Sequence, residues 1–415
     1  MKVHVIGAGV AGLAAAVKLA QRGVTVELSE AAAQAGGRCR SYFDPQLGQV
    51  IDNGNHLVLS GNTAIMAYLD AIGARDRLAG PERAEFVWAD VRTGKRWTLR
   101  PNEGPIPWWV FSPSRRVPDT RVGDYLGLVP LTRPQPGKRV DQAMRCEGVL
   151  WERLMEPFLL AALNTEAKSG SADLAGAVVR ETLAKGGAAY RPRIAEPTLA
   201  AAFVDPAITT LESAGATVRL GRRLRKLEMA EDRITGLTFA DGEVTVGAGE
   251  TVVLAVPPWV AGELVPRLTV PTEHRAIVNA HFRVTPPSNA EPMIGVIGGT
   301  VEWIFAFPER ISVTVSGADR LVDMDREALA RLLWKDVAAV HGLSQDLPPW
   351  QVVKEKRATF AATPEQDALR PPAKTRWSNL ILAGDWTATG LPATIEGAVR
   401  SGGHAADLAL ARLVV

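Results

Sequence analysis

The sequence predicts an α/β protein in which a parallel-sheet domain is joined to a second domain of mixed antiparallel sheet and helices. Three observations support this fold class. The chain opens with a strand–helix–strand pattern, its middle contains a helical stretch followed by a run of strands, and a second glycine-rich helix start lies near its end. With 415 residues, the chain is long enough for two or three domains that bury a large ligand.

The composition of the chain excludes several classes of protein. Hydrophobic residues make up 47% and charged residues 22% of the chain, as in ordinary globular proteins. The 47 basic and 45 acidic residues give a net charge of +2, so a nucleic acid is not an expected partner. Cys39 and Cys146 are too few for a disulfide framework or a structural zinc site, so we predict no metal site and a reducing, cytoplasmic location.

The N-terminal segment predicts a βαβ unit. Residues 3–6 form a short apolar strand, residues 13–21 have helical spacing, and residues 24–28 form a second strand that leads to Glu30. The turn between strand and helix reads VIGAGVAG, which has the GxGxxG spacing of a dinucleotide-binding loop.

Each glycine of that pattern has a physical role in binding a pyrophosphate. Gly7 allows the tight turn, Gly9 lets the pyrophosphate approach the backbone, and Gly12 permits close packing of helix and strand. The helix N-terminus then faces the phosphates, and Glu30 is placed to bind ribose hydroxyls. A purely structural glycine turn or a nicotinamide enzyme would share these features.

The middle and end of the chain supply the second domain. Helical patterns dominate residues 144–184, with Ser171 as an N-cap, and residues 218–256 read as strands and turns. Beyond Pro258 four segments are rich in strand residues. In one of them apolar residues at 311, 313 and 315 alternate with Ser and Thr, which predicts a strand with one apolar face.

Three further motifs indicate which cofactor is bound. GGRCRS, with Gly36, Gly37 and Arg38, is a second loop able to bring backbone amides and a guanidinium to the same pyrophosphate. DNGNH follows at residues 52–56, and AGDWTATGLPATIEGAVRSG begins at residue 383. Together with GxGxxG, these motifs resemble the flavin-containing amine oxidase and phytoene desaturase superfamily, whose members bind FAD. Gln34 departs from the pattern, which has an arginine two residues before the glycine pair.

The resemblance implies that both ends of the chain bind one extended FAD. The first end binds its phosphates, and a helix beginning near Thr394 and Ile395 directs its N-terminus at the isoalloxazine, where a reduced flavin is negatively charged. The remaining implied cofactor contacts are an adenine contact at Leu224, a ribityl contact at Gly384 and Asp385, and flavin contacts at Asn55 and His56.

The resemblance also implies the domain boundaries. It assigns a Rossmann-like FAD-binding domain of the glutathione-reductase type to residues 1–75, 196–258 and 375–415. A discontinuous substrate-binding or cap domain then comprises residues 76–195 and 259–374.

Within the superfamily, four stretches resemble the hydroxysqualene dehydroxylases: DNGNHLVLSGN, IPWWVFSPSRRVP, IVNAHFRV and GDWTATGLPATIEGAVRSG. This resemblance implies the reduction of hydroxysqualene, a C30 isoprenoid alcohol, to squalene in hopanoid biosynthesis. Amine oxidases carry a lysine near the flavin where this chain has Asn279.

Replacing an allylic hydroxyl by hydrogen requires a hydride donor, which is the reduced flavin, and a proton donor for the departing water. We predict His56 as the proton donor, with Asp52, Asn279 and His281 as further candidates. Asp52 as a turn residue and His56 as a structural histidine are the alternatives.

Aromatic residues provide material for a long apolar substrate cavity: Trp108, Trp109, Phe111, Trp151, Phe158, Trp303, Phe305 and Phe307. The run from Trp108 to Phe111, followed by Arg115 and Arg116, suits contact with a membrane surface, and a buried loop anchor is the alternative. We therefore expect a cytoplasmic protein that is peripheral on the inner face of the plasma membrane.

Two other functions remain open from the sequence. A carotenoid-type desaturase would run the same fold oxidatively on a polyene, and an escort protein would bind a prenyl group without catalysis. The complete GGR and GD motifs argue against the escort, because function is carried by sites rather than by folds. The chain has no second GxGxxG, so the donor that re-reduces the flavin is not identified.

Overall fold

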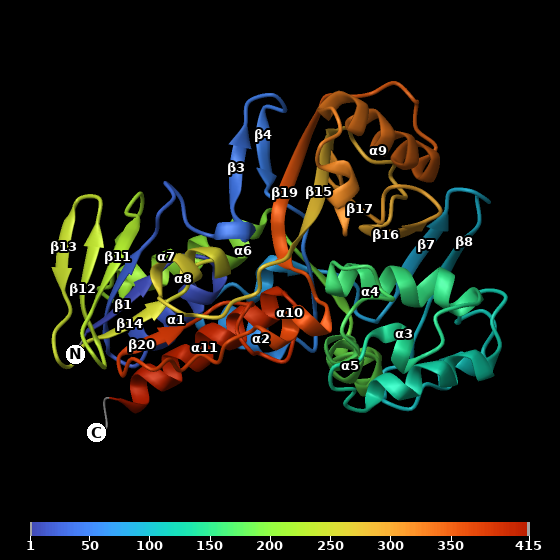
Figure 1. Ribbon diagram of the computed structural model, residues 1–415. Helices are drawn as coiled ribbons and strands as arrows, with labels where there is room; N and C mark the ends of the chain where they lie inside the picture. The colour runs from blue at the N-terminus through green and yellow to red at the C-terminus, as the bar shows by residue number, and fades with distance from the viewer. Residues whose placement is uncertain (1, 413–415) are drawn as a thin grey trace.

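A computed structural model describes residues 2–412 and is built around two large sheets that lie at different ends of the molecule (Figure 1). The smaller of the two is a parallel sheet with the strand order β10-β2-β1-β14-β20. Its strands are β1 (Lys2–Ile6), β2 (Thr25–Ser29), β10 (Thr217–Arg219), β14 (Thr251–Leu254) and β20 (Leu380–Leu382). The predicted βαβ unit at the N-terminus is therefore confirmed, with α1 (Val10–Ala20) as its helix.

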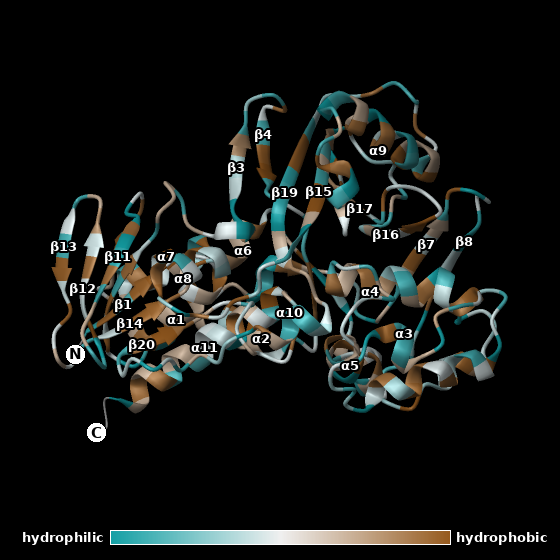
Figure 2. Cartoon of the chain, in the orientation of Figure 1, coloured by the Kyte–Doolittle hydropathy of each residue, from teal (hydrophilic) through white to brown (hydrophobic). Residues whose placement is uncertain are grey.

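The parallel sheet has apolar strands, as Figure 2 shows for β1, β14 and β20, because helices cover it. α1 packs directly against α11 (Ile395–Ala411), so the first and last helices of the chain lie side by side. A Cβ atom added to Gly402 of α11 would lie 2.1 Å from the carbonyl oxygen of Ala11. Only glycine therefore allows this close crossing of the two helices.

The second sheet has seven strands in the order β19-β15-β18-β17-β16-β7-β8. Its strands are β7 (Phe86–Asp90), β8 (Arg96–Leu99), β15 (His274–Arg283), β16 (Met293–Ile297), β17 (Trp303–Phe307), β18 (Arg310–Val315) and β19 (Trp350–Phe360). α9 (Arg326–His341) packs on one face, where Ile311, Val313 and Val315 are fully buried in one apolar cluster.

The predicted alternation along β18 is confirmed, but its polar side is not exposed to solvent. Ser312 and Thr314 are also buried, because the DNGNH segment packs against this face of the sheet. Asn279 and His281 of β15 lie opposite them in the strand register. The second face of the seven-stranded sheet is thus buried and polar at β15 and β18, whereas at β16 and β17 it carries the apolar side chains of Met293 and Phe305.

The remaining elements are the other helices, turns and strands of the chain. The predicted helical region contains a π-helical turn at Trp151–Met155, α4 (Glu156–Leu163) and α5 (Ala172–Glu181), and Ser171 caps α5 as expected. The other helices are α2 (Thr63–Ala71), α3 (Val140–Ala143), α6 (Leu199–Phe203), α7 (Asp205–Ser213), α8 (Pro258–Leu264) and α10 (Pro364–Ala368), with 3₁₀ turns η1 (Gly37–Cys39), η2 (Arg75–Arg77), η3 (Trp108–Phe111), η4 (Val122–Thr132), η6 (Leu183–Lys185), η7 (Gly187–Ala189) and η8 (Ala318–Leu321). The other strands are β3 (Ser41–Asp44), β4 (Gln49–Asp52), β5 (Leu57–Leu59), β6 (Leu78–Ala79), β9 (Pro192–Ala195), β11 (Leu224–Met229), β12 (Ile234–Phe239) and β13 (Gly242–Thr245).

The strands of the parallel sheet fall within residues 1–75, 196–258 and 375–415, and those of the seven-stranded sheet fall within residues 76–195 and 259–374. A small sheet of β5, β9 and β6 crosses this division, because β9 pairs with strands from both sides of residue 75. The exact domain boundaries stay a prediction.

Candidate active site

The GxGxxG loop adopts the packing that its glycines predict. Gly7 has a φ of 106°, and an added Cβ would lie 2.3 Å from the carbonyl oxygen of Ala255. A Cβ on Gly12 would lie 1.9 Å from the carbonyl oxygen of Gly7. Gly7 thus makes the turn and Gly12 brings α1 against it.

Gly9 differs from these two glycines because its missing side chain leaves open space. A Cβ added to Gly9 would meet no other described atom within 4 Å. Within residues 2–412, no side chain caps the N-terminus of α1, which begins directly after Gly9. The free backbone N–H groups of this first turn therefore point toward space that an anion can fill.

The second glycine loop lies beside the first. Gly9 and Gly36 form a parallel β-bridge, and the N–H of Gly36 donates to the carbonyl oxygen of Ala8 at 2.8 Å. Gly36 and Gly37 have φ angles of 104° and 56°, which allow the tight bend into Arg38. The structure brings together the two loops that the sequence assigns to one pyrophosphate.

Glu30 lies at the end of β2, next to the first glycine loop. One of its carboxylate oxygens accepts the N–H of Ala8 at 2.7 Å, and the other accepts the N–H of Ala32 at 2.8 Å. The N–H of Arg222 donates to the backbone carbonyl of Glu30 at 2.7 Å, so the segment that enters β11 at Leu224 runs past the same point. Contacts of Glu30 with ribose and of Leu224 with adenine remain predictions.

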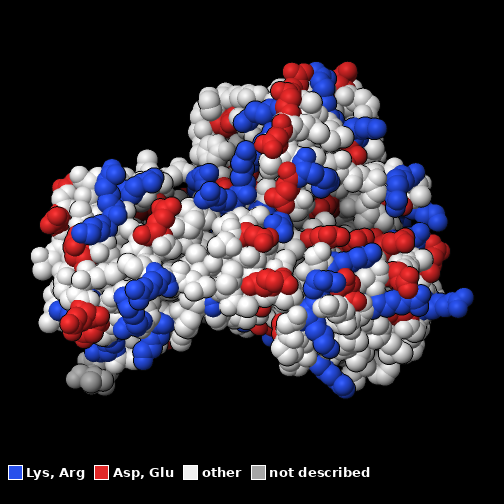
Figure 3. All heavy atoms as spheres, in the orientation of Figure 1, with Lys and Arg blue, Asp and Glu red and all other residues white. Residues whose placement is uncertain are grey.

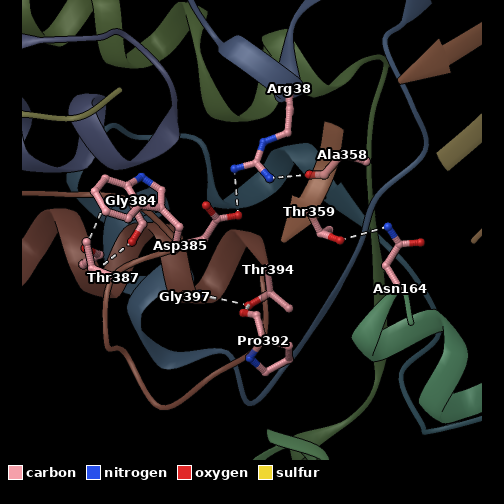
Figure 4. A network of polar contacts seen from close by, with 12 residues as sticks. Arg38, Asn164, Ala358, Thr359, Gly384, Asp385, Thr387, Pro392, Thr394 and Gly397 are labelled. Atoms are coloured by element: carbon pink, nitrogen blue, oxygen red, sulfur yellow. Dashed lines mark hydrogen bonds and ion pairs between the residues drawn. The ribbon is translucent and has the colours of Figure 1, made fainter. Parts of the chain in front are cut away.

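Arg38 joins the N-terminal loops to the C-terminal motif (Figure 4). Its Nη2 lies 2.7 Å from Oδ2 of Asp385, and its Nη1 donates to the carbonyl oxygen of Ala358 at 2.5 Å. Asp385 is buried, whereas the Arg38 side chain is 42% exposed. The guanidinium therefore has an exposed side that is available to a phosphate.

The start of α11 is where the sequence predicts it. The helix begins at Ile395, and the side-chain oxygen of Thr394 accepts the N–H of Gly397 at 3.0 Å as an N-cap (Figure 4). Gly402, where α11 crosses α1, lies about two turns into the helix. At 1.5 Å per residue, the N-terminus of α11 extends about 10 Å past the crossing. The two helix starts are thus separated along the site, as expected for the two ends of one extended ligand.

Two residues that sequence reasoning missed hold these loops in place. Arg370 is buried and donates to the carbonyl oxygens of Asp385 and Thr387 at 3.1 and 2.5 Å. Glu396 accepts the N–H groups of Ala64 and Ile65 at 3.1 and 2.9 Å, and so caps α2 from the first turn of α11. Arg370 lies outside the quoted motifs, and Glu396 lies within the C-terminal motif but acts on Ala64 and Ile65, more than 300 residues away, which no local pattern indicates.

Asp52 links three segments of the chain. Its Oδ1 accepts the hydroxyl of Ser41 at 2.6 Å and the N–H of Leu199, at the start of α6, at 2.9 Å. The guanidinium of Arg310 lies 3.9 Å from its other oxygen. Burial raises the pKa of Asp52 despite these partners, which act in the opposite direction.

His281 is completely buried and both of its ring nitrogens are engaged. Nε2 lies 3.0 Å from the carbonyl oxygen of Asp52, which only accepts, so Nε2 carries the hydrogen. Arg310 Nε donates to Ser312 Oγ at 3.0 Å, and Ser312 Oγ lies 2.8 Å from His281 Nδ1. Burial and the charge of Arg310 lower the pKa of His281 to about 3, so the ring is neutral and fixes the DNGNH loop.

Asn279 also supports this loop. Its Oδ1 accepts the hydroxyl of Thr314 at 2.8 Å and lies 3.4 Å from the N–H of Asn55. A Cβ on Gly54 would lie 2.8 Å from Asn279 Nδ2, so the loop passes directly over this amide. A neutral amide therefore occupies the place in β15 at which the resemblance to amine oxidases predicts a lysine.

His56 and Asn55 line a narrow recess together with Asp52, and its apolar wall comprises Ile194, Ala195, Leu199, Phe305 and Phe307. The recess has room for about one water molecule, at about 10 Å³. Burial and the positive charge of Arg38 lower the pKa of His56 to about 4, so its ring is neutral near pH 7. The Oδ1 atom of Asn55 is buried without a hydrogen-bond partner among the described residues.

The predicted aromatic residues divide between the interior and the surface. Trp109, Trp151 and Phe305 are buried, and Phe305 and Phe307 reach the recess. Trp108 and Phe111 are each 62% exposed.

Comparisons with known proteins agree with this geometry. A family model described as flavin containing amine oxidoreductase matches residues 10–410. Hydroxysqualene dehydroxylase of Rhodopseudomonas palustris is 56% identical over 410 residues, which cover 99% of this chain and 98% of that protein. Hydroxysqualene dehydroxylase of Sinorhizobium fredii is 55% identical over 408 residues, which cover 98% of each chain. The chain belongs to the hydroxysqualene dehydroxylase family of flavin-containing amine oxidoreductases.

Solved structures support the fold of this family. Cyclohexylamine oxidase from Brevibacterium oxydans matches with a TM-score of 0.74 at 15% identity, over 100% of this chain and 99% of that chain. The expected fold class, a Rossmann-like FAD-binding domain with a second domain of mixed sheet and helices, is confirmed.

As a member of the hydroxysqualene dehydroxylase family, the chain is an FAD-dependent oxidoreductase. Its residues fit the cofactor: open space lies at Gly9, α1 has an uncapped N-terminus in the described chain, and Arg38 is partly exposed beside them. When bound, the phosphates would lie at these groups and the flavin would lie toward the start of α11.

Proposed function

We propose that the chain catalyses the reductive dehydroxylation of hydroxysqualene to squalene. The observation that carries this proposal is the similarity to proteins named hydroxysqualene dehydroxylase over nearly the full chain. In this reaction a C–O bond breaks, a hydride forms a C–H bond at the allylic carbon, and a proton joins the hydroxyl, which leaves as water. Bound FAD in its reduced form supplies the hydride. NAD(P)H or an electron-transfer protein then has to reduce it again.

The residues of the chain have to supply the proton, because hydroxide leaving into an apolar pocket would be an unpaired buried charge. His281 has both ring nitrogens engaged and Asn279 has only an amide to offer. Asp52 is committed to Ser41 and to the start of α6. His56 lines the recess and is the proton donor that we propose.

The test of this function is anaerobic incubation of the chemically reduced enzyme with hydroxysqualene and, separately, of the oxidised enzyme with phytoene. We expect stoichiometric squalene from the first and no change in the second. Desaturated phytoene formed by the oxidised enzyme would instead establish the carotenoid-type alternative. Substrate that co-purifies with the protein but is never converted would support the escort function.

We also propose that the enzyme binds a membrane surface to reach this substrate. An apolar patch consists of Ile106, Trp108 and Phe111 around η3, and Leu126 and Val129 in η4, all exposed. The rings of Trp108 and Phe111 lie 6.1 Å apart. Exposed clusters of large apolar side chains are a feature of membrane-contact sites.

The structure changes which of the expected residues belong to this surface. Trp109 is 6% exposed and packs edge-on against Tyr125 at 5.3 Å, so its assignment to the membrane was wrong and it anchors η3 to η4. Arg115 and Arg116 donate to the backbone carbonyls of Arg100 and Val110, so both help to fold this region. Arg121 and Arg133, which flank η4, are exposed and complement anionic lipids.

No helix within residues 2–412 is long and apolar enough to cross a membrane. Figure 3 shows basic and acidic side chains intermixed over the visible face, so a single electrostatic field does not select the partner. Binding at the surface through the apolar patch is the arrangement that these observations support.

A further inference from the structure

The polar end of the recess offers an acceptor that the chain does not use itself. Asn55 has its amide nitrogen turned toward β18, where Nδ2 donates to the carbonyl oxygen of Val313 and to Thr314 Oγ1, both at 3.2 Å. A backbone carbonyl only accepts, so this contact fixes which end of the amide is nitrogen. The oxygen is the free end, buried and without a partner among the described residues.

The recess that Asn55 lines suits one hydroxyl on an apolar chain. Phe305, Phe307, Ile194 and Leu199 make the wall of the recess apolar, and the space inside suits one water-sized group. An isolated buried acceptor destabilises the site until a donor reaches it. A prenyl alcohol would bring that donor, whereas the corresponding hydrocarbon would leave the oxygen unpaired.

We propose that Asn55 Oδ1 accepts the hydrogen of the substrate hydroxyl and is the residue that distinguishes the alcohol from the hydrocarbon product. This proposal rests on the proposed dehydroxylase function. As the hydroxyl oxygen takes up a proton from the donor, its own O–H becomes a stronger donor, so the hydrogen bond to Asn55 strengthens before water departs. Once water has left, the product has no donor for Asn55 and is bound less tightly.

The position of the amide depends on its neighbours. The backbone N–H of Asn55 lies next to Asn279 Oδ1 on β15, and Asn55 Nδ2 donates to Thr314 Oγ1 on β18. These two strands therefore orient the side-chain oxygen of Asn55. Replacing Thr314 by Val removes one of the two Nδ2 contacts and the hydroxyl that donates to Asn279 Oδ1, but it leaves the Asn55 acceptor itself in place. This substitution is therefore the matched control.

The test compares Asn55→Leu with the wild type in FAD-loaded enzyme. Titrations of the oxidised enzyme, which holds no hydride to transfer, give the dissociation constants of hydroxysqualene and squalene from the change in flavin absorbance. We expect the preference for the alcohol to fall about threefold to tenfold in Asn55→Leu. The single-turnover rate of the reduced enzyme should fall at least tenfold, because the hydrogen bond is strongest in the transition state. Thr314→Val should change both quantities by less than Asn55→Leu does.

Unchanged preference and rate in FAD-loaded Asn55→Leu would overturn the role of Asn55, while squalene formed by the wild type would leave the dehydroxylase function intact. A wild type that forms no squalene would instead refute the function itself. If Asn55→Leu does not retain FAD, Asn55→Ser replaces it in the test. This variant also withdraws the acceptor from the recess, and the same two measurements, the preference for the alcohol and the single-turnover rate, then test the role of Asn55. Loss of FAD from both variants would assign Asn55 to the cofactor and contradict the proposal.

Discussion

Arg38 and Asp385 lie 347 residues apart in the chain and form an ion pair with 2.7 Å between Nη2 and Oδ2. The pair connects the GGRCRS loop, which contains Arg38, to the C-terminal GD motif, which contains Asp385 (Figure 4). The two ends of the cofactor site are therefore held together by side chains of the protein itself. Several consequences of this arrangement can be measured.

Removing either partner of this ion pair should have unequal effects. Arg38→Ala leaves the Asp385 carboxylate, whose side chain is 6% exposed, without its charged partner, whereas Asp385→Asn leaves a guanidinium that is 42% exposed and can be hydrated. We expect Arg38→Ala to lower the free energy of unfolding by about 2–3 kcal/mol and Asp385→Asn by about 1 kcal/mol. Urea unfolding of the FAD-loaded variants measures both. Equal losses would show that burial of Asp385 does not decide the energetics.

Gly9→Val should prevent FAD binding while the protein still folds. A Cβ added at Gly9 would meet no described atom within 4 Å, and the φ of −69° and ψ of 170° at this residue suit any amino acid, so we expect the protein to tolerate the change. The new methyl groups would fill the space assigned to the pyrophosphate. The measurements are flavin absorbance after purification and the circular dichroism spectrum.

The control for this substitution is Gly249→Val, because a Cβ added there would also meet no described atom within 4 Å. It lies in the loop before β14, and FAD should be retained at full occupancy. A fully loaded Gly9→Val enzyme would disprove the assignment of this loop to the cofactor.

The rate of dehydroxylation should rise as the pH falls. The pKa of His56 is about 4, so between pH 8 and pH 6 its protonated fraction increases about tenfold for each unit of decrease. If His56 is the proton donor, single-turnover rates of the reduced enzyme follow this slope, and His56→Ala is slower by about 10²- to 10⁴-fold and loses the slope. His404, which is exposed on α11, provides the control as His404→Ala. A wild-type rate in His56→Ala would assign His56 a structural role.

Membrane binding should depend on the exposed members of the apolar patch. The double variant Trp108→Ser/Phe111→Ser should sediment with anionic liposomes at least tenfold less strongly, because each aromatic ring contributes about 2 kcal/mol when it leaves water. Flavin content should not change, since both side chains point to solvent. Phe43→Ser is the matched control, as Phe43 is also 62% exposed but lies on the β3–β4 hairpin. Equal loss of binding in the control would show that the patch is not the contact.

Local patterns predicted the elements of the fold well. Helix and strand spacing and the capping residue Ser171 depend on neighbours in sequence, and the structure confirms them. The resemblance placed the start of the last helix near Thr394 and Ile395, and Thr394 is its N-cap. The polar face of β18 was less predictable. Alternation indicates that Ser312 and Thr314 share a face, but not that the DNGNH loop buries it.

The site was predictable only where a motif marks it. The glycine loops lie together as expected, because each carries its own conformational signature. The ion pair between Arg38 and Asp385 and the support from Arg370 arise from contacts between segments outside the regular strands, which periodicity cannot indicate. Trp109 was wrongly assigned to the surface because Trp108 and Trp109 are adjacent and of the same residue type, so the sequence cannot show which one faces solvent. On the 3₁₀ turn their side chains point in opposite directions, and Trp108 is exposed whereas Trp109 is buried.

The order of strands in the parallel sheet has a consequence for biosynthesis. β1 lies in the first residues of the chain, yet it pairs with β14, which in turn pairs with β20 at Leu380–Leu382. At roughly 5–20 residues per second, a ribosome takes roughly 20–75 s to travel from β1 to β20. Until β14 has been synthesised, β1 lacks one of its two neighbours, and β14 in turn lacks β20 until residues 380–382 follow. The parallel sheet, and with it the site proposed for the cofactor, is thus completed only near the end of translation.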